Sequence, residues 1–174
     1  METREQLLAA LRRAYDGRSW HGPNLLGSIR GLTPADVFAR PGRGRHSVYD
    51  LVLHAAYWKY IARRRLTGEK GGSFPLKGSN FFPEPKVKDA RAVREARALL
   101  DEMHRSLVAA VEALPDAVFA GRRGKWTAGE LVAGVAAHDL YHAGQIQLVR
   151  KLNVERGRRF RDTTARQPGA RRGH

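Results

Sequence analysis

Four long stretches of this chain repeat apolar residues every three or four positions, the spacing that gives an α-helix one apolar face. They run from about Thr3 to Tyr15, Ser47 to Leu66, Asp89 to Leu114, and Thr127 to Lys151 or Leu152. No segment shows the sustained alternation of apolar and polar residues that marks a half-buried strand. Because each apolar face has to be buried against another element, the pattern predicts an all-α protein.

The starts of these helices carry recognisable capping residues. In "TREQ", Thr3 is placed to cap the first helix while Gln6 reaches back to it, and in "WTAGE" Thr127 and Glu130 have the same relation. Ser47 is a favourable cap for the second helix. These signals predict where three of the four helices begin.

The connections predict how the helices are arranged. After the first helix the chain breaks and then favours a short helix from Pro23 to Ile29, because proline suits a first helical turn. The connection from Thr67 to Lys88 is long for a compact domain, so it either has a function or crosses from one end of the molecule to the other. Four helices with one long crossover predict a four-helix bundle.

Composition limits the classes of function. A length of 174 residues suits one domain, and the absence of cysteine excludes disulfides, a cysteine nucleophile and a thiolate metal site. Any metal ion has to be held by histidine, carboxylate or water. The charged, amphipathic N-terminus is not a signal peptide, and no segment is long and apolar enough to predict a membrane span, so a cytoplasmic location is expected.

The formal net charge of +15 is concentrated in part at the end of the chain. Residues 153–174 hold seven arginines against two acidic residues and few apolar ones, so they predict a basic, disordered tail after a bundle domain of residues 1–152. A solvated basic surface is the favoured interpretation. Weak, nonspecific contact of the tail with nucleic acid is the alternative, although no recognition-helix signature accompanies the charge.

Two histidines interrupt the apolar face of the last helix, in "AAHDLYHAGQIQLVRK". The predicted inward face consists of Leu131, Val135, His138, His142, Ile146 and Val149. His138 and His142 are one helical turn apart, so both rings project from the same side and can bind one ion. Tyr141 and Gln145 lie on or beside that face, within reach of the rings or of a substrate.

A third histidine, His54, lies on the apolar face of the second helix between Leu51 and Trp58. If the two faces meet, three neutral imidazoles converge and leave an open position for water, which is the pattern of a catalytic rather than a structural metal site. Trp58 can form a wall of such a site. The alternative is three separate core histidines, each bonded to backbone or hydroxyl groups.

Two other residues near these faces are assigned to packing or to the surface. His104 is expected to be a core histidine of the third helix rather than a fourth ligand. Asp139 is expected to point to another side of its helix and to make a surface or interface contact. No general base can be identified from the sequence.

Three stretches resemble the DinB/YfiT-like superfamily of metal-dependent enzymes: "WHGPNLLGSI", "HSVYDLVLHAAYWKYIARRRLTG" and "WTAGELVAGVAAHDLYHAGQIQLVRK". The resemblance implies an up-down-down-up four-helix bundle, often a homodimer, with metal-binding histidines that match His54, His138 and His142. It also implies a divalent ion, with zinc or nickel first and iron or manganese as further options. Characterised relatives include transferases and isomerases that use an exogenous low-molecular-weight thiol.

The leading hypothesis is therefore a metal-dependent enzyme with hydrolase or thiol-dependent transferase chemistry on a small-molecule substrate at the open metal position. The alternative is a non-enzymatic, metal-stabilised bundle whose basic surface and tail bind nucleic acid weakly.

Overall fold

The structure is a computed structural model that describes the backbone of residues 3–165 and the side chains of residues 3–157. Four long helices account for most of it, namely α1 (Arg4–Tyr15), α4 (Val48–Thr67), α5 (Ala90–Ala113) and α6 (Ala128–Ala165). The smaller elements are the helices α2 (Leu25–Ile29) and α3 (Pro34–Phe38), the 3-10 helix η1 (Asp116–Ala120) and the strands β1 (Arg122–Arg123) and β2 (Trp126–Thr127). The prediction of a mostly helical protein is confirmed.

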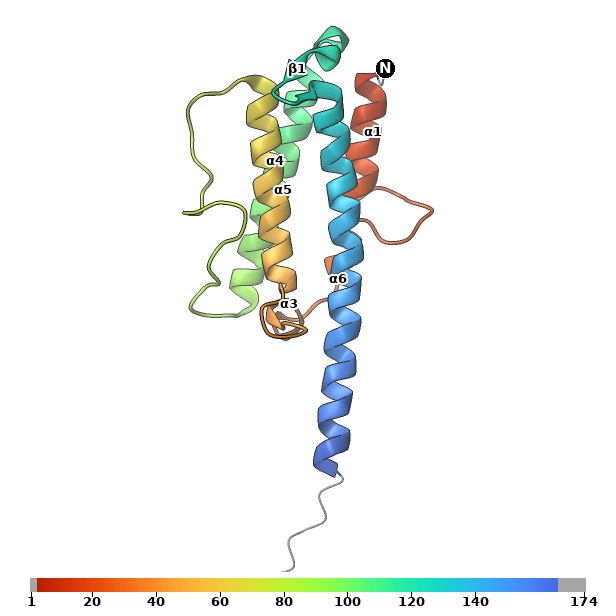
Figure 1. The fold of residues 1–174 in the computed structure, drawn as a ribbon, viewed down its shortest axis with the longest axis vertical. Helices are drawn as coiled ribbons and strands as arrows, with labels where there is room; N and C mark the ends of the chain where they lie inside the picture. The colour runs from red at the N-terminus through yellow and green to blue at the C-terminus, as the bar shows by residue number, and fades with distance from the viewer. Residues whose placement is uncertain (1–2, 166–174) are drawn as a thin grey trace, which may run out of the picture.

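The four long helices lie side by side, as Figure 1 shows. In that view α1 and α6 run downward while α4 and α5 run upward. Helix α4 packs against α5 and α6, and α1 packs against α6 and α5. The connection of residues 68–89 returns along the outside of α4 and α5 to the start of α5. No described helix is both long and apolar enough to cross a membrane.

The predicted caps are present. The backbone N–H of Gln6 donates to the Thr3 hydroxyl at 3.3 Å, and the Thr3 N–H donates to the Gln6 side chain at 2.9 Å. The pair at the start of α6 is similar, since the Thr127 N–H donates to Glu130 at 2.7 Å and the Glu130 N–H to the Thr127 hydroxyl at 3.1 Å. Ser47 caps α4 in the same way. Local hydrogen bonding therefore fixes where these helices begin.

Helix α6 is longer than predicted, because it continues to Ala165 instead of ending near Leu152. The expectation that the tail begins directly after Leu152 is wrong for its first residues. The side chain of Asn153 donates to the carbonyl of Ala39 at 3.2 Å, and Arg156 donates to the carbonyl of Arg40 at 3.1 Å. These tertiary contacts hold a turn of helix that has little apolar surface of its own. Residues 166–174 of the predicted tail lie outside the described residues.

The hairpin of β1 and β2 was not predicted from the sequence. Its two strands are only two residues long each and pair Arg122 with Thr127 and Arg123 with Trp126. Strands this short cannot show a period of two, so the pattern that marks a strand is absent from the sequence. The turn between them uses Gly124 at φ 74°, a left-handed conformation that glycine adopts without strain.

The core divides into two apolar clusters separated by a polar layer. One cluster gathers around Leu53, Leu100 and Ile146, and the other around Leu11, Leu107 and Val132. Between them lies one polar or aromatic residue from each long helix. This polar layer consists of Tyr15 from α1, Lys59 from α4, His104 from α5 and Asp139 from α6.

Contacts within the polar layer link all four helices. Lys59 and Asp139 form an ion pair in which both side chains are 0% exposed. The Lys59 ammonium lies 5.2 Å from the centre of the Tyr15 ring, and that ring stacks on His104 with 3.7 Å between ring centres. Burial lowers the pKa of Lys59 and raises that of Asp139, and the opposite charge of the partner offsets part of each shift.

The prediction that Asp139 makes a surface contact is wrong. Its side chain is fully buried because the central buried stripe of α6 runs through Val132, Asp139 and Ile146, seven residues apart. The two histidines lie at the edge of this stripe. His104, expected to be a core histidine, is 6% exposed and does not belong to the group of close metal-ligating side chains in the described part of the chain.

We expect Lys59→Met to lower the free energy of unfolding by about 3–5 kcal/mol, because it leaves a buried carboxylate without a partner. The double variant Lys59→Met/Asp139→Leu should recover most of this loss, since an apolar pair needs no desolvation of charge. Urea unfolding of the three proteins measures both effects. Equal stability of Lys59→Met and the wild-type protein would contradict the account of this pair.

A second prediction concerns pH. Burial, with a smaller contribution from the charge of Lys59, lowers the pKa of His104 from 6.5 to about 3. The unfolded chain therefore binds the proton more readily than the folded one, and stability decreases as pH falls from about 6.5 toward 3. The contribution is at most about 1.4 kcal/mol per pH unit. His104→Phe, which preserves the ring stack, should flatten this dependence, and an unchanged slope in urea unfolding at pH 7, 6 and 5 would refute it.

Candidate metal centre

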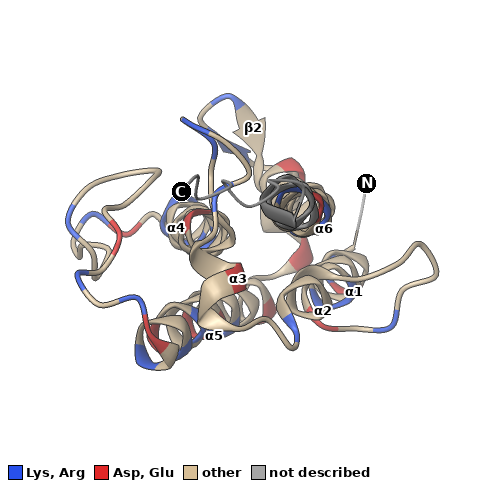
Figure 2. Ribbon diagram, turned by 90° about the horizontal axis from the view of Figure 1, so that it is seen from below, with Lys and Arg blue, Asp and Glu red and all other residues tan. Residues whose placement is uncertain are grey.

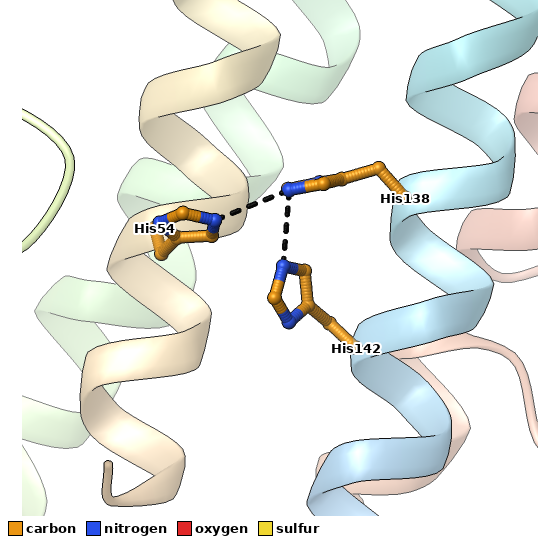
Figure 3. A group of neighbouring side chains, drawn as sticks. All are labelled: His54, His138 and His142. Carbon is orange, nitrogen blue, oxygen red and sulfur yellow. Dashed lines mark hydrogen bonds between the residues drawn. The ribbon is translucent and has the colours of Figure 1, made fainter.

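His54, His138 and His142 converge in the space between α4 and α6. Figure 3 shows the ring of His54 reaching from α4 toward the two rings that project from α6. The Nε2 atom of His138 lies 3.1 Å from Nε2 of His54 and 3.0 Å from Nε2 of His142. One nitrogen from each ring lies within 4.8 Å of the other two. The expectation that the two apolar faces meet at these residues agrees with this arrangement.

The outer nitrogens of two of these rings are already engaged. Nδ1 of His54 lies 3.1 Å from the backbone carbonyl of Asn80, and Nδ1 of His142 lies 2.6 Å from Oε1 of Gln145. A carbonyl oxygen can only accept, so both Nδ1 atoms carry the proton. Each Nε2 atom therefore presents a lone pair to the centre. This outward bond is what fixes the ring orientation of metal-ligating histidines in general.

No proton arrangement satisfies the His138 ring. Its Nε2 faces the lone pairs of both His54 and His142 but can carry one proton, which points well at only one of them. Its Nδ1 atom is buried and has no hydrogen-bond partner among the described residues. A buried polar atom without a partner is costly, whereas one cation shared by three nitrogens uses all three lone pairs. Imidazoles around one tetrahedral zinc ion place their nitrogens roughly 3.3 Å apart, which is close to the observed separations.

Electrostatics keep these rings neutral. Burial, with a smaller contribution from the charges of neighbouring histidines, lowers the pKa of His138 to about 3 and that of His142 to about 4. Burial also lowers the pKa of His54. Metal binding requires a neutral imidazole, so the three rings are in the state that a ligand needs at neutral pH.

The long connection between α4 and α5 covers one side of the centre. Asn80 accepts from His54 through its backbone and from the Trp58 indole N–H through its side chain, at 3.0 Å. Phe81 stacks on the His54 ring with 4.6 Å between ring centres. Asn80 has φ 64°, a left-handed conformation that asparagine tolerates better than most residues. The connection was expected either to have a function or to cross from one end of the molecule to the other. It crosses the molecule and also orients His54.

The structure places the three predicted pocket residues around the centre. Trp58 lies beside the centre, with 6.4 Å between the centre of its ring and the centre of the His138 ring. Gln145 contacts His142 directly and donates through its amide nitrogen to the Tyr141 hydroxyl at 3.0 Å. Tyr141 is 62% exposed, but its ring lies edge-on to that of His142 with 5.1 Å between ring centres, so it borders the centre from the solvent side. Sequence reasoning missed Asn80 and Phe81, and only the length of their loop hinted at a role.

Two pockets adjoin the centre from opposite ends of the α4–α6 groove. One, of about 240 Å³, includes His138 and Trp58 in its lining, and the other, of about 420 Å³, includes His46 and Gln145. A larger pocket, of about 780 Å³, lies around Trp20 between α1 and α6 and contains none of the three histidines. The first two pockets are linked to the centre by position rather than by size, because one includes His138 itself and the other includes Gln145, which contacts His142.

The sequence profile of the DinB superfamily matches residues 18–146, well over half of the chain. The chain therefore belongs to the DinB superfamily, a metal-binding family. The match includes all three histidines that converge between α4 and α6. Neither the comparison with curated proteins nor the comparison with solved structures found a match.

We expect His138→Ala to abolish stoichiometric zinc binding and Gln145→Ala to weaken it by about tenfold, because Gln145 only orients a ligand. Gln147→Ala is the matched control. Gln147 lies on the same helix but bonds to the carbonyl of Ser28, so its loss should leave zinc affinity unchanged. Competition with a chromophoric chelator measures all three affinities. Equal weakening by the two glutamine variants would contradict this role for Gln145.

Proposed function

We propose that this protein is a metal-dependent enzyme on the up-down-down-up four-helix bundle of its family, with α1, α4, α5 and α6 as the four helices. His54, His138 and His142 hold one divalent ion, with zinc or nickel as the first choice and iron or manganese as further options. The observation that carries the proposal is the set of three inward Nε2 atoms that no proton arrangement satisfies.

Three imidazoles leave a divalent ion at least one open position, where it supplies a Lewis acid that lowers the pKa of a thiol or water. The chain's own side chains prepare the site for this role. Asn80 and Gln145 keep the protons of His54 and His142 on the outer nitrogens. Trp58 and Phe81 pack against the His54 ring and give that side of the centre an apolar surface.

Thiol-dependent transfer is the reaction that the site supports best, with hydrolysis as the second candidate. A transferase has to hold a thiol and an acceptor at once, and two pockets adjoin the centre from opposite ends of the groove. In such a reaction the sulfur forms a bond to an electrophilic atom of the acceptor, and the leaving group departs with the electrons of the broken bond. Hydrolysis needs one organic substrate and water, so it leaves the second pocket without a role.

The remaining expectations stay predictions. They are the homodimer, the cytoplasmic location and the weak contact of the basic tail with nucleic acid. The alternative of a non-enzymatic, metal-stabilised bundle retains the same three histidines, and it differs from the main proposal in lacking turnover and in binding nucleic acid weakly through the basic surface and tail.

Activity decides between these functions. Protein purified without a His-tag and loaded with zinc or nickel should conjugate a low-molecular-weight thiol to 1-chloro-2,4-dinitrobenzene with release of chloride. The rate should fall to background in His138→Ala and remain in His104→Phe, which alters a buried histidine outside the centre. A protein that holds stoichiometric metal but transfers neither glutathione, cysteine nor a thiol attached to an amino sugar would contradict the transferase proposal. Hydrolysis of p-nitrophenyl acetate by the same metal-loaded protein would favour the second candidate.

A further inference from the structure

The pocket that touches His138 extends along the groove between α4 and α6, away from the histidines. Its lining is largely apolar near the centre, where it includes Trp58, Ile61, Leu131 and Val135. At its far end it reaches Arg65, Trp126 and Glu130. Trp58 therefore lies at the metal end, and Trp126 lies at the end formed by the hairpin.

A second pocket of about 590 Å³ begins where the first one ends. The two share Arg65 and Trp126, and the second adds Arg122, Arg123 and Lys125 from the hairpin. Figure 2 shows Lys and Arg residues in this hairpin, which projects beside α6. An apolar channel that starts at His138 thus opens into a cationic basin formed by Arg65, Arg122, Arg123 and Lys125.

The charges of the cationic basin are not neutralised by neighbouring acids. None of its four side chains forms an ion pair among the described residues. Arg122 donates to the carbonyl of Lys125 at 3.1 Å, and Arg123 donates to the carbonyls of Leu66 and Arg122 at 3.4 and 2.9 Å. Backbone carbonyls hold these two guanidinium groups in place without cancelling their charge.

One acid borders the channel, but it is already engaged. The Glu130 carboxylate accepts hydrogen bonds from the Thr127 N–H and hydroxyl at 2.7 and 3.0 Å. These bonds lower the pKa of Glu130, with a smaller contribution from the charge of Arg122. The four cationic side chains of the basin outnumber this single negative charge. An anionic group is therefore favoured on the hairpin side of Trp126.

The geometry points to the class of substrate that this channel accepts: an elongated organic anion, with an aromatic or apolar body between Trp58 and Trp126 and a carboxylate or phosphate in the cationic basin. This inference rests on the proposed function, because it takes the His138 end of the channel as the site of reaction. Flanking aromatic rings suit a flat or apolar body, and clustered arginines suit carboxylate and phosphate oxygens.

The length of the channel sets the size of such a substrate. Arg65 lies eleven residues after His54 on α4, and Glu130 lies eight residues before His138 on α6. At a rise of 1.5 Å per residue these separations are about 16 and 12 Å. A molecule that reacts at the histidines and reaches the cationic basin is therefore on the order of 12–16 Å long.

Binding of small probes tests this inference without requiring turnover. The probes are 4-phenylbutanol, 4-phenylbutyrate and 4-phenylbutyl phosphate, which share one apolar body and differ in the head group. Calorimetric titration in metal-free and zinc-loaded protein should give at least tenfold tighter binding of an anionic probe than of the alcohol. The stronger of the two anionic probes identifies carboxylate or phosphate as the preferred head group.

Variants locate the effect. Arg65→Gln should reduce the preference for the anionic probe by at least fivefold, whereas Arg105→Gln, an exposed arginine of α5, should leave it unchanged. Equal affinity for the alcohol and both anions, or a preference that Arg65→Gln does not alter, would overturn the inference. Tighter binding of a 20-nucleotide single strand that displaces the probes would overturn it in favour of nucleic acid. A wild-type protein that prefers the anionic probe but binds no zinc or catalyses no thiol transfer would overturn only the proposed function.

Discussion

The buried ion pair of Lys59 and Asp139 is the contact on which the arrangement of the site depends. It joins α4 to α6, the same two helices that carry His54 on one side and His138 and His142 on the other. Because both charges are fully buried, each requires the other, and the pair has little freedom to slide or rotate. Tyr15 and His104 complete the layer from α1 and α5, so all four long helices meet at this level of the core.

The histidine centre uses the rigidity of this layer and adds a second source of order. The connection of residues 68–89 adds the buried rings of Phe74 and Phe82 to the apolar cluster around α4. Its Asn80 also orients the His54 ring and the Trp58 indole. On the other side, Gln145 orients the His142 ring. Two rings are thus held from outside while their inner nitrogens face each other and His138. The same groove continues past His138 toward the hairpin, so the centre and the cationic basin share one surface of the protein.

Much of this arrangement could be predicted from the sequence, because local rules determine it. The long helices follow from apolar periodicity and their starts from the capping pairs of Thr3 and Thr127. His54, His138 and His142 could be grouped because each lies on an apolar face, and those faces have to pack together. Features set by distant contacts could not be predicted. The loop of Asn80 has no pattern that indicates where it folds back, and the extension of α6 depends on the carbonyls of Ala39 and Arg40. The burial of Asp139 had a signal in its spacing from Val132 and Ile146. The predicted inward face followed the two histidines instead, so Asp139 was expected to point to another side of the helix.

The central claim is that three imidazoles, and no other side chains, bind one divalent ion in this protein. X-ray absorption spectroscopy of the stoichiometric zinc form measures the ligands of the ion directly. The account predicts three imidazole nitrogens at about 2.0–2.1 Å with one or two further light ligands. A spectrum with one imidazole or none, or with a shell of oxygens alone, would contradict it.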